Sequence, residues 1–108
     1  MVETAIVCAI CRVLVTNHVY GKPLPRDVIL NKASYPAHKG AMAKTAFDAV
    51  RQKPFITDYG KRGIQLDNSE FGALVQFLHD RCEWERFELE LRIKHFEGWE
   101  GIDWKNEQ

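Results

Sequence analysis

The sequence predicts a single, mainly α-helical domain with one small β-hairpin and a further C-terminal helix. Apolar residues recur at three- and four-residue spacing along four segments, which is the period of amphipathic helices. Residues 55–66 hold two β-prone runs around a tip of glycines and basic residues, which is the pattern of a hairpin. The length of 108 residues and the hydrophobic content of 45% are those of one folded domain with a modest core.

The four expected helices are bounded by turn-forming and helix-breaking residues. Pro25 suits the first turn of the second helix, where its missing N–H costs nothing. Pro54 ends the third helix because it cannot continue the hydrogen-bond ladder. The helices are expected at residues 3–16, 25–32, 37–52 and 69–81. Their expected inward-facing residues are Ala5, Ile6, Ala9, Ile10, Val13 and Leu14, then Val28 and Ile29, then Ala43, Ala46, Phe47 and Val50, and finally Phe71, Leu74, Val75 and Leu78.

The C-terminal part is acidic and rich in aromatic residues, and its secondary structure is ambiguous. Residues 87–94 alternate between apolar and polar, which favours a strand, but Glu, Leu, Arg and Lys are good helix formers. We expect a helix over residues 84–96. Such a helix has one apolar side formed by Trp84, Phe87 and Leu91 and another formed by Leu89, Ile93 and Phe96. Two apolar sides require two partners, for example the helix's own domain and another chain.

The net charge of zero hides an uneven distribution. Residues 1–66 hold ten basic and four acidic residues, a net charge of +6. Residues 67–108 hold five basic and eleven acidic residues, a net charge of −6. This division indicates one part that binds a polyanion and another part with a different role.

The order helix, helix, turn, helix, basic-tipped hairpin, helix resembles the winged helix-turn-helix superfamily over residues 3–80. The resemblance is carried by residues 25–30 (PRDVIL) in the second helix, by residues 38–51 and, most specifically, by residues 54–66. The ending Lys94-His95-Phe96-Glu97-Gly98-Trp99 is similar to that of small uncharacterised archaeal winged-helix proteins. The resemblance implies a winged-helix domain at residues 1–82 and an acidic, aromatic dimerisation segment at residues 83–108. Many such domains bind DNA, but some bind RNA or only proteins.

The outer side of the third helix independently favours DNA binding. A recognition helix at about residues 37–52 would enter the major groove, and a wing at residues 59–63 would reach the backbone or the minor groove. Small Ala41 permits close approach to a base, and Lys44 and Thr45 can donate hydrogen bonds. Asp48 would accept a hydrogen bond from a cytosine amino group or form an ion pair with Lys44. The expected DNA-binding residues are His38, Lys39, Ala41, Lys44, Thr45, Asp48, Arg51, Lys61 and Arg62. The alternative is a solvated basic surface.

These observations predict a sequence-specific transcriptional regulator that binds double-stranded DNA as a homodimer. Aromatic anchors suit an interface, and two recognition helices can read a palindrome. The expected dimer contacts are Trp84, Phe87, Leu91 and Trp99. Two alternatives stay open: the aromatic residues cap the domain's own core, or the domain is an adaptor that binds protein and not DNA.

The three cysteines do not suggest a disulfide framework, because their number is odd. We expect Cys8 and Cys11 to be small buried residues with reduced thiols. Two alternatives use the same side chains. Cys8, Cys11, His79 and Cys82 supply a possible set of zinc ligands, and the cysteines could instead sense the redox state. We expect no metal.

The motifs of several other protein classes are missing from the sequence. It contains no phosphate-binding Gly-rich loop, nucleophile elbow or paired-carboxylate motif, so we expect no enzymatic activity, no cofactor and no small-molecule ligand. The longest apolar stretch, residues 5–15, is interrupted by Arg12 and is too short to span a bilayer. It also lacks the features of a signal peptide, so we expect a cytoplasmic protein.

Overall fold

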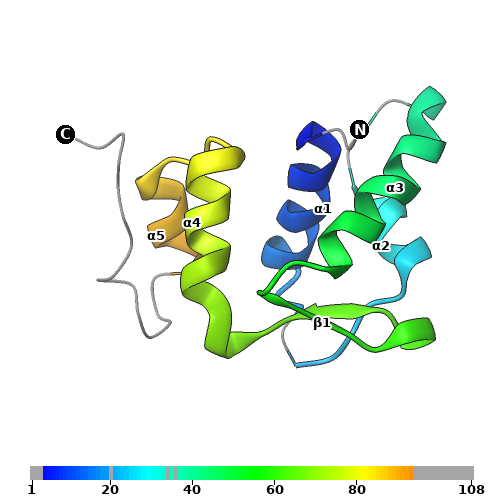
Figure 1. Ribbon diagram of the computed structural model, residues 1–108. Helices are drawn as coiled ribbons and strands as arrows, with labels where there is room; N and C mark the ends of the chain where they lie inside the picture. The colour runs from blue at the N-terminus through cyan, green and yellow to red at the C-terminus, as the bar shows by residue number, and fades with distance from the viewer. Residues whose placement is uncertain (1–3, 20, 34, 36, 94–108) are drawn as a thin grey trace.

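The computed structural model describes residues 4–19, 21–33, 35 and 37–93, and within them it contains five α-helices and one β-hairpin (Figure 1). The prediction of a mainly α-helical fold with a small hairpin is therefore confirmed. The elements are α1 (Thr4–Thr16), α2 (Arg26–Lys32), α3 (Gly40–Arg51), β1 (Ile56–Asp58), β2 (Ile64–Leu66), α4 (Phe71–Arg81) and α5 (Arg86–Ile93). Short 3₁₀ turns occupy Ala37–Lys39 (η1), Gly60–Arg62 (η2) and Asn68–Glu70 (η3).

Helix α1 lies at the centre of the molecule and contacts each of the other four helices. Helices α2 and α3 cover one side of it, and α4 and α5 cover the other (Figure 1). Seven of its 13 residues are buried, which is expected for a helix that is apolar around most of its circumference. Even so, no described helix is long and apolar enough to cross a membrane.

The predicted apolar stripes of the third and fourth helices are confirmed. In α3, Ala43 and Ala46 are fully buried, and their small size lets the helix approach α1 closely. Helix α2 differs from the prediction, because Val28 is 36% exposed whereas Leu30 is buried. Ile29 and Leu30 set the inward side of this short helix, so Val28 lies nearly opposite on the helical circumference.

The hairpin is antiparallel, with Ile56 opposite Leu66 and Asp58 opposite Ile64. The connector between α1 and α2 pairs with β2 of this hairpin through one antiparallel bridge at Leu24. Leu24 and Ile64 exchange two backbone hydrogen bonds, each 3.0 Å long. The backbone N–H of Leu66 also donates to the carbonyl of Val19 at 2.6 Å. The hairpin is therefore tied to the segment that leads into α2.

Residues 86–93 form a helix, as predicted, but Trp84 and Glu85, which the prediction included, lie in an irregular segment before it; residues 94–96 lie outside the described part. Leu89 and Ile93 are buried in the core shared with α1 and α4, whereas Phe87 and Leu91 are exposed. Helix α5 thus has two apolar sides, but Trp84, which was predicted on the side of Phe87 and Leu91, precedes the helix and is buried in the core. The described part of the C-terminal segment packs as a further layer of the same domain.

Cys8 and Cys82 form a disulfide that joins α1 to the end of α4 across 74 positions of sequence. The prediction of a reduced Cys8 is therefore wrong. Helical periodicity shows which side of α1 Cys8 occupies, but it cannot show that Cys82 lies opposite. The bond also removes two thiolates from the zinc alternative, and the described residues contain no group of three His, Cys, Asp or Glu able to hold a metal.

Cys11 is a buried free thiol, as predicted. Burial raises the pKa of its thiol to about 12, because the apolar surroundings disfavour the thiolate.

We expect Cys11 to resist an aromatic disulfide reagent in the native protein at pH 8. Unfolding without reductant should expose one reactive thiol, and unfolding with reductant should expose three. A thiol that reacts rapidly in the native protein would contradict this result.

Candidate nucleic-acid interface

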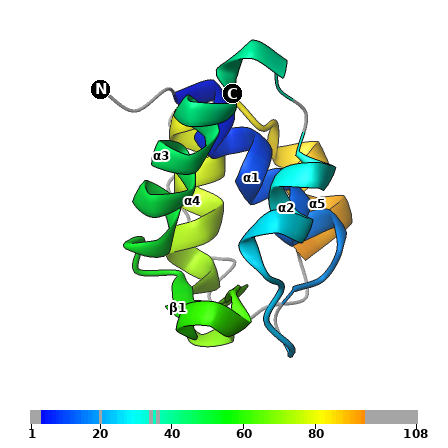
Figure 2. The same cartoon turned by 90° about the vertical axis from the view of Figure 1, so that its right-hand side faces the viewer.

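The outer sides of α2 and α3 and the tip of the hairpin face the same side of the molecule (Figure 2). We call this surface the α2–α3–wing face and the hairpin the wing. Helix α3 lies on it with its inner side against α1 and its outer side exposed. The wing tip, η2, lies near the start of α2, because both contribute residues to one surface hollow.

The outer side of α3 carries most of the predicted recognition residues. Those that are exposed there are Ala41, Lys44, Thr45 and Asp48. The Thr45 hydroxyl donates to the carbonyl of Ala41 at 3.3 Å, so its oxygen remains able to accept from a ligand. Met42, which the prediction did not include, is 44% exposed on the same helix. Its exposure follows from the helical period, since Met42 lies away from the buried stripe at Ala43 and Ala46.

The third helix, predicted to be the recognition helix over about residues 37–52, begins later than predicted. Residues 37–39 form the 3₁₀ turn η1, and the α-helix starts at Gly40. Glycine is a weak helix former, and Lys39 at the N-cap makes no side-chain cap. His38 is therefore exposed on the preceding turn, and Lys39 is half-buried.

Arg51 connects α3 to the wing. Its Nη2 lies 2.9 Å and its Nε 3.0 Å from Asp58 Oδ2 on β1. Its Nη1 lies 3.4 Å from Asp48 Oδ1, so Asp48 pairs with Arg51, where the sequence suggested Lys44. The hydrogen bond that Arg51 donates to Asp58 is the largest cause that raises the pKa of Arg51. Arg51 thus lies at the edge of the face with its charge compensated by two carboxylates.

Asp58 also fixes the shape of the wing tip. Its Oδ1 accepts a hydrogen bond from the backbone N–H of Gly60 at 2.9 Å. That bond, followed by the contact with Arg51, holds the pKa of the Asp58 carboxyl below its usual value. Asp58 is therefore ionised at neutral pH and stabilises the turn that positions Lys61.

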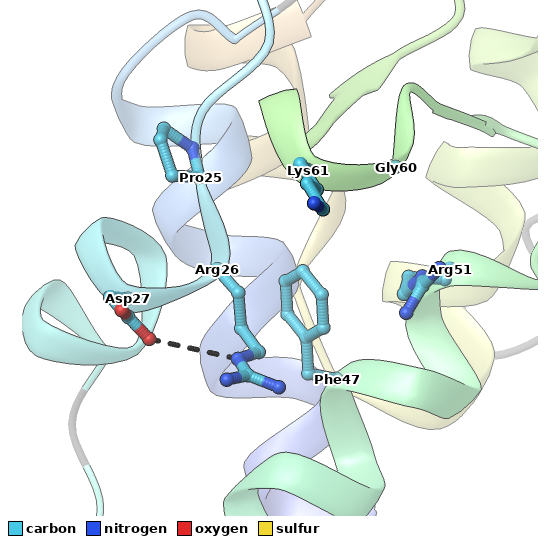
Figure 3. Close-up of a pocket in the computed structure, with 7 residues that line it drawn as sticks. All are labelled: Pro25, Arg26, Asp27, Phe47, Arg51, Gly60 and Lys61. Carbon is cyan, nitrogen blue, oxygen red and sulfur yellow. Dashed lines mark ion pairs between the residues drawn. The ribbon is translucent and has the colours of Figure 1, made fainter.

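Three cations from three separate elements converge on a surface hollow of about 450 Å³ (Figure 3). Arg26 comes from the start of α2, Arg51 from the end of α3 and Lys61 from the wing tip. Phe47 lies between the two arginines in Figure 3, and Asp27, whose Oδ1 is 3.6 Å from Arg26 Nε, is the one acidic residue among the described residues of the lining. The prediction from the sequence did not include Arg26 among the site residues. Its position directly after Pro25, at the start of a helix, could have indicated that it belongs there.

Lys61 and Arg62 are both exposed on η2, where the sequence placed them. The Arg62 guanidinium lies over the Tyr59 ring, 5.7 Å from its centroid. The tip is closed by Gly63, whose N–H donates to the Gly60 carbonyl at 3.1 Å. The two cations therefore project from a compact turn, which carries them past the end of α3.

The predicted dimer contacts that the structure describes lie on or just before α5 and not on the α2–α3–wing face. Trp84 is buried against its own domain, at 4% exposure, and leaves little surface for a partner. Phe87 and Leu91 are exposed on α5. Trp99 lies outside the described residues.

Comparison with known proteins assigns no relative to this chain: no family model matches it, and neither a curated protein nor a solved structure does. Its function must therefore be inferred from the chemistry of its surfaces. The α2–α3–wing face combines a helix with small and donor side chains on its outer side, a basic hollow and a projecting basic tip. This combination can contact a polyanion along its backbone and at its groove edges.

Proposed function

We propose that this protein is a sequence-specific transcriptional regulator that binds double-stranded DNA through α3 and the wing. The observation that carries the proposal is the convergence of Arg26, Arg51 and Lys61, from three separate elements, beside the exposed side of α3. Clustered cations repel one another and a polyanionic ligand relieves that repulsion; Asp27 and Asp58 offset only part of it here, because they pair with Arg26 and Arg51 and leave Lys61 exposed.

In this proposal the outer side of α3 enters the major groove. The helix of 12 residues is about 18 Å long, which allows it to cross the groove. Lys44 would donate to base edges or phosphates, Thr45 would accept from a base amino group, and Ala41 would approach a base or a thymine methyl group. Arg26 and Lys61, which line the same hollow beside α3, would contact phosphates, and Arg62 would reach the adjacent backbone or minor groove.

The exposed apolar residues of the same elements favour a second candidate, a winged-helix adaptor that binds protein. Val28, Met42 and Tyr59 are 36–44% exposed on α2, on α3 and beside the wing tip. Methionine and aromatic residues are enriched at protein interfaces, and Asp27 would be repelled by phosphate. A protein partner would bind with a much weaker salt dependence than DNA.

A cytoplasmic location is part of the proposal, because a regulator must have access to DNA. The Cys8–Cys82 disulfide is the feature that disfavours it, since most cytosolic thiols are kept reduced. Alkylation of thiols in freshly lysed cells measures the fraction of the protein that carries the bond in its own compartment.

Replacement of both wing cations should flatten the salt dependence of DNA binding. For DNA of mixed sequence, the slope of log K against log salt concentration reports the number of phosphates neutralised, at about −0.9 for each. The double variant Lys61→Ala/Arg62→Ala should therefore have a slope smaller in magnitude by about two. Fluorescence anisotropy of a labelled duplex between 50 and 200 mM salt, roughly the range in which such binding falls steeply, measures it.

The matched control removes two exposed arginines that are not part of the α2–α3–wing face. Arg81→Ala/Arg92→Ala changes the net charge by the same amount on α4 and α5 and should leave the slope unchanged. Selection from a random duplex library should then yield a preferred sequence, and Lys44→Ala should weaken that preference. Absence of binding at low salt would rule out the DNA proposal and leave the adaptor.

A further inference from the structure

The outer side of α5 presents an apolar surface with no role in the DNA-binding proposal. Phe87 is 68% and Leu91 is 71% exposed, more than any other large hydrophobic residue in the described part of the chain. They are four residues apart, so they lie one above the other on the same side of the helix. We call these two residues the α5 patch.

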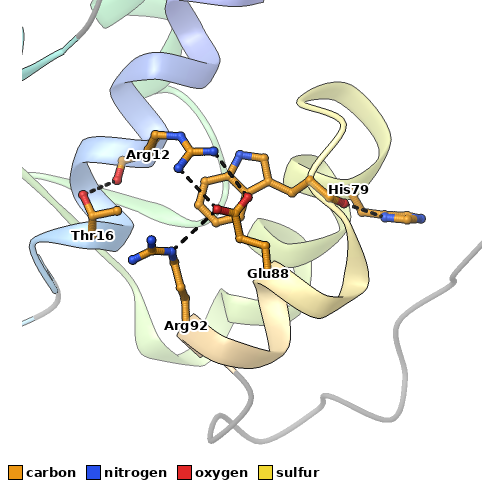
Figure 4. A network of polar contacts seen from close by, with 6 residues as sticks. Arg12, Thr16, His79, Glu88 and Arg92 are labelled. Carbon is orange, nitrogen blue, oxygen red and sulfur yellow. Dashed lines mark hydrogen bonds and ion pairs between the residues drawn. The ribbon is translucent and has the colours of Figure 1, made fainter.

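The α5 patch is held rigidly by the contacts on the inner side of the helix. Arg12 of α1 donates two hydrogen bonds to Glu88, at 3.3 and 3.4 Å, and its guanidinium stacks on the Trp84 ring, 4.6 Å from the centroid (Figure 4). The Trp84 carbonyl accepts a hydrogen bond from Nδ1 of buried His79, over 3.0 Å. The preceding Cys82 is bonded to α1. Little conformational entropy would be lost when a partner binds, because the helix is already fixed.

The charges beside the α5 patch are arranged for a copy of the same helix. On one flank Arg86 precedes Glu90, with their side chains 3.2 Å apart. On the other flank Glu88 precedes Arg92, at 3.9 Å. Each flank therefore carries one positive and one negative residue, one helical turn apart. A copy that runs in the opposite direction places Arg86 near the partner's Glu90 and Glu88 near the partner's Arg92.

We propose that a second copy of this chain covers the α5 patch. The two α5 helices pack antiparallel across a twofold axis, with Phe87 of each chain against Leu91 of the other. A twofold contact of this kind is closed and uses the same surface on both chains. Helix α5 is about 12 Å long, so the helix pair alone buries less area than a standard interface, and the association it supports is weak.

The proposed dimer leaves the α2–α3–wing face uncovered. Figure 1 shows α5 on the opposite side of α1 from α3 and the wing tip. Two chains joined through α5 would each keep a free DNA-binding surface. The inference does not rest on DNA binding, and its test is carried out without DNA.

The two single charge reversals on one flank provide the sharpest test. Arg86→Glu places two glutamates on this flank, and Glu90→Arg places two arginines there. Each variant alone should self-associate about tenfold more weakly than the unmodified chain, because attraction is replaced by repulsion at both symmetry-related pairs. An equimolar mixture should recover an affinity close to that of the unmodified chain, since opposite charges again meet. Sedimentation equilibrium of the full chain, with the variants and their mixture, measures all three.

The mixture separates contacts between chains from contacts within one helix. Loss of the Arg86–Glu90 pair destabilises the helix in either variant, and mixing cannot repair that. A parallel arrangement would bring the flank of Arg86 against the flank of Glu88, and the mixture would then retain one repulsive pair on each flank. Failure of the mixture to recover, when both variants show native circular dichroism, would overturn the antiparallel dimer.

A second pair of variants tests the apolar contact. Phe87→Ala/Leu91→Ala should weaken association about 100-fold, because both anchors of the patch are lost. The control Val28→Ala/Met42→Ala removes two exposed apolar side chains from α2 and α3 and should leave association unchanged. A full-length chain that stays monomeric at millimolar concentration overturns the proposal and assigns the patch to another occupant, such as this chain's own residues 94–108 or a different protein. Association that is unaffected by Phe87→Ala/Leu91→Ala overturns it as well.

Discussion

Loss of the Cys8–Cys82 disulfide should lower the free energy of unfolding by about 2–4 kcal/mol. The bond joins residues separated by 74 positions, so it restricts the unfolded chain far more than a short loop would. Urea unfolding of Cys8→Ser/Cys82→Ser and of the oxidised chain, both at neutral pH, measures the difference. Reductant should move the midpoint of the unmodified chain towards that of the variant, and it should not move the variant's midpoint.

The loss of stability should be greatest at the junction between α4 and α5. Cys82 is the C-cap of α4, and two residues later the N–H of Trp84 donates to the Leu78 carbonyl at 3.0 Å. Without the disulfide, the connection between α4 and α5 is held in place by the packing of Trp84 and by the ion pair between Arg12 and Glu88. Hydrogen exchange of the reduced protein should therefore increase first in α5. Uniform loss of protection in all helices would contradict a local role for the bond.

The elements that could be predicted from the sequence are those defined by local pattern. An apolar stripe such as Ala43, Ala46 and Phe47 repeats within one helix, so its period reveals both the helix and its buried side. The wing tip was similarly visible, because glycines and basic residues occupy adjacent positions. The buried side of α2 is partly mispredicted, because its seven residues make barely two turns and a helical period cannot be recognised in so few residues.

The features that could not be predicted join segments far apart in the chain. Arg12 pairs with Glu88 across 76 positions, and Cys8 bonds to Cys82 across 74. A periodic pattern shows the direction in which a side chain points along its helix. It does not show which other segment lies there, because that depends on the packing of the whole core.

The same limit applies to the candidate site. Exposure of Lys44 and Thr45 follows from the amphipathic pattern of α3 alone. The compensation of Arg51 by Asp58, and the convergence of Arg26 with Lys61, arise only when the wing folds back beside α2 and α3. The contribution of each cation to DNA binding therefore depends on how firmly the wing is held in place.

Replacement of Gly63 by alanine should displace the wing and destabilise the protein by about 3 kcal/mol or more. Gly63 has φ 106° and ψ −157°, a region that essentially only glycine occupies. A Cβ atom there would meet the backbone of the connector, with the Leu24 carbonyl oxygen at 1.8 Å and Pro25 N at 2.6 Å. Relief of the clash requires the two hydrogen bonds between Leu24 and Ile64 to break.

Two other glycines provide graded controls for the Gly63→Ala variant. Gly60 has φ 66° but open space around it, so Gly60→Ala should cost about 1 kcal/mol. Gly72 lies in α4 with open space, so Gly72→Ala should be neutral or stabilising by up to about 1 kcal/mol. Urea unfolding orders the three variants.

The DNA affinity of Gly63→Ala distinguishes a displaced wing from a generally loosened fold. If the wing moves, Lys61 and Arg62 leave their positions beside α3, and the salt dependence should fall towards that of Lys61→Ala/Arg62→Ala while α3 stays folded. If the whole fold loosens, affinity should fall in proportion to the folded fraction, with the salt dependence unchanged. A Gly63→Ala variant as stable as the unmodified chain would show that the connector does not pass against the wing at Leu24. The placement of the basic tip beside α2 would then lose its structural basis.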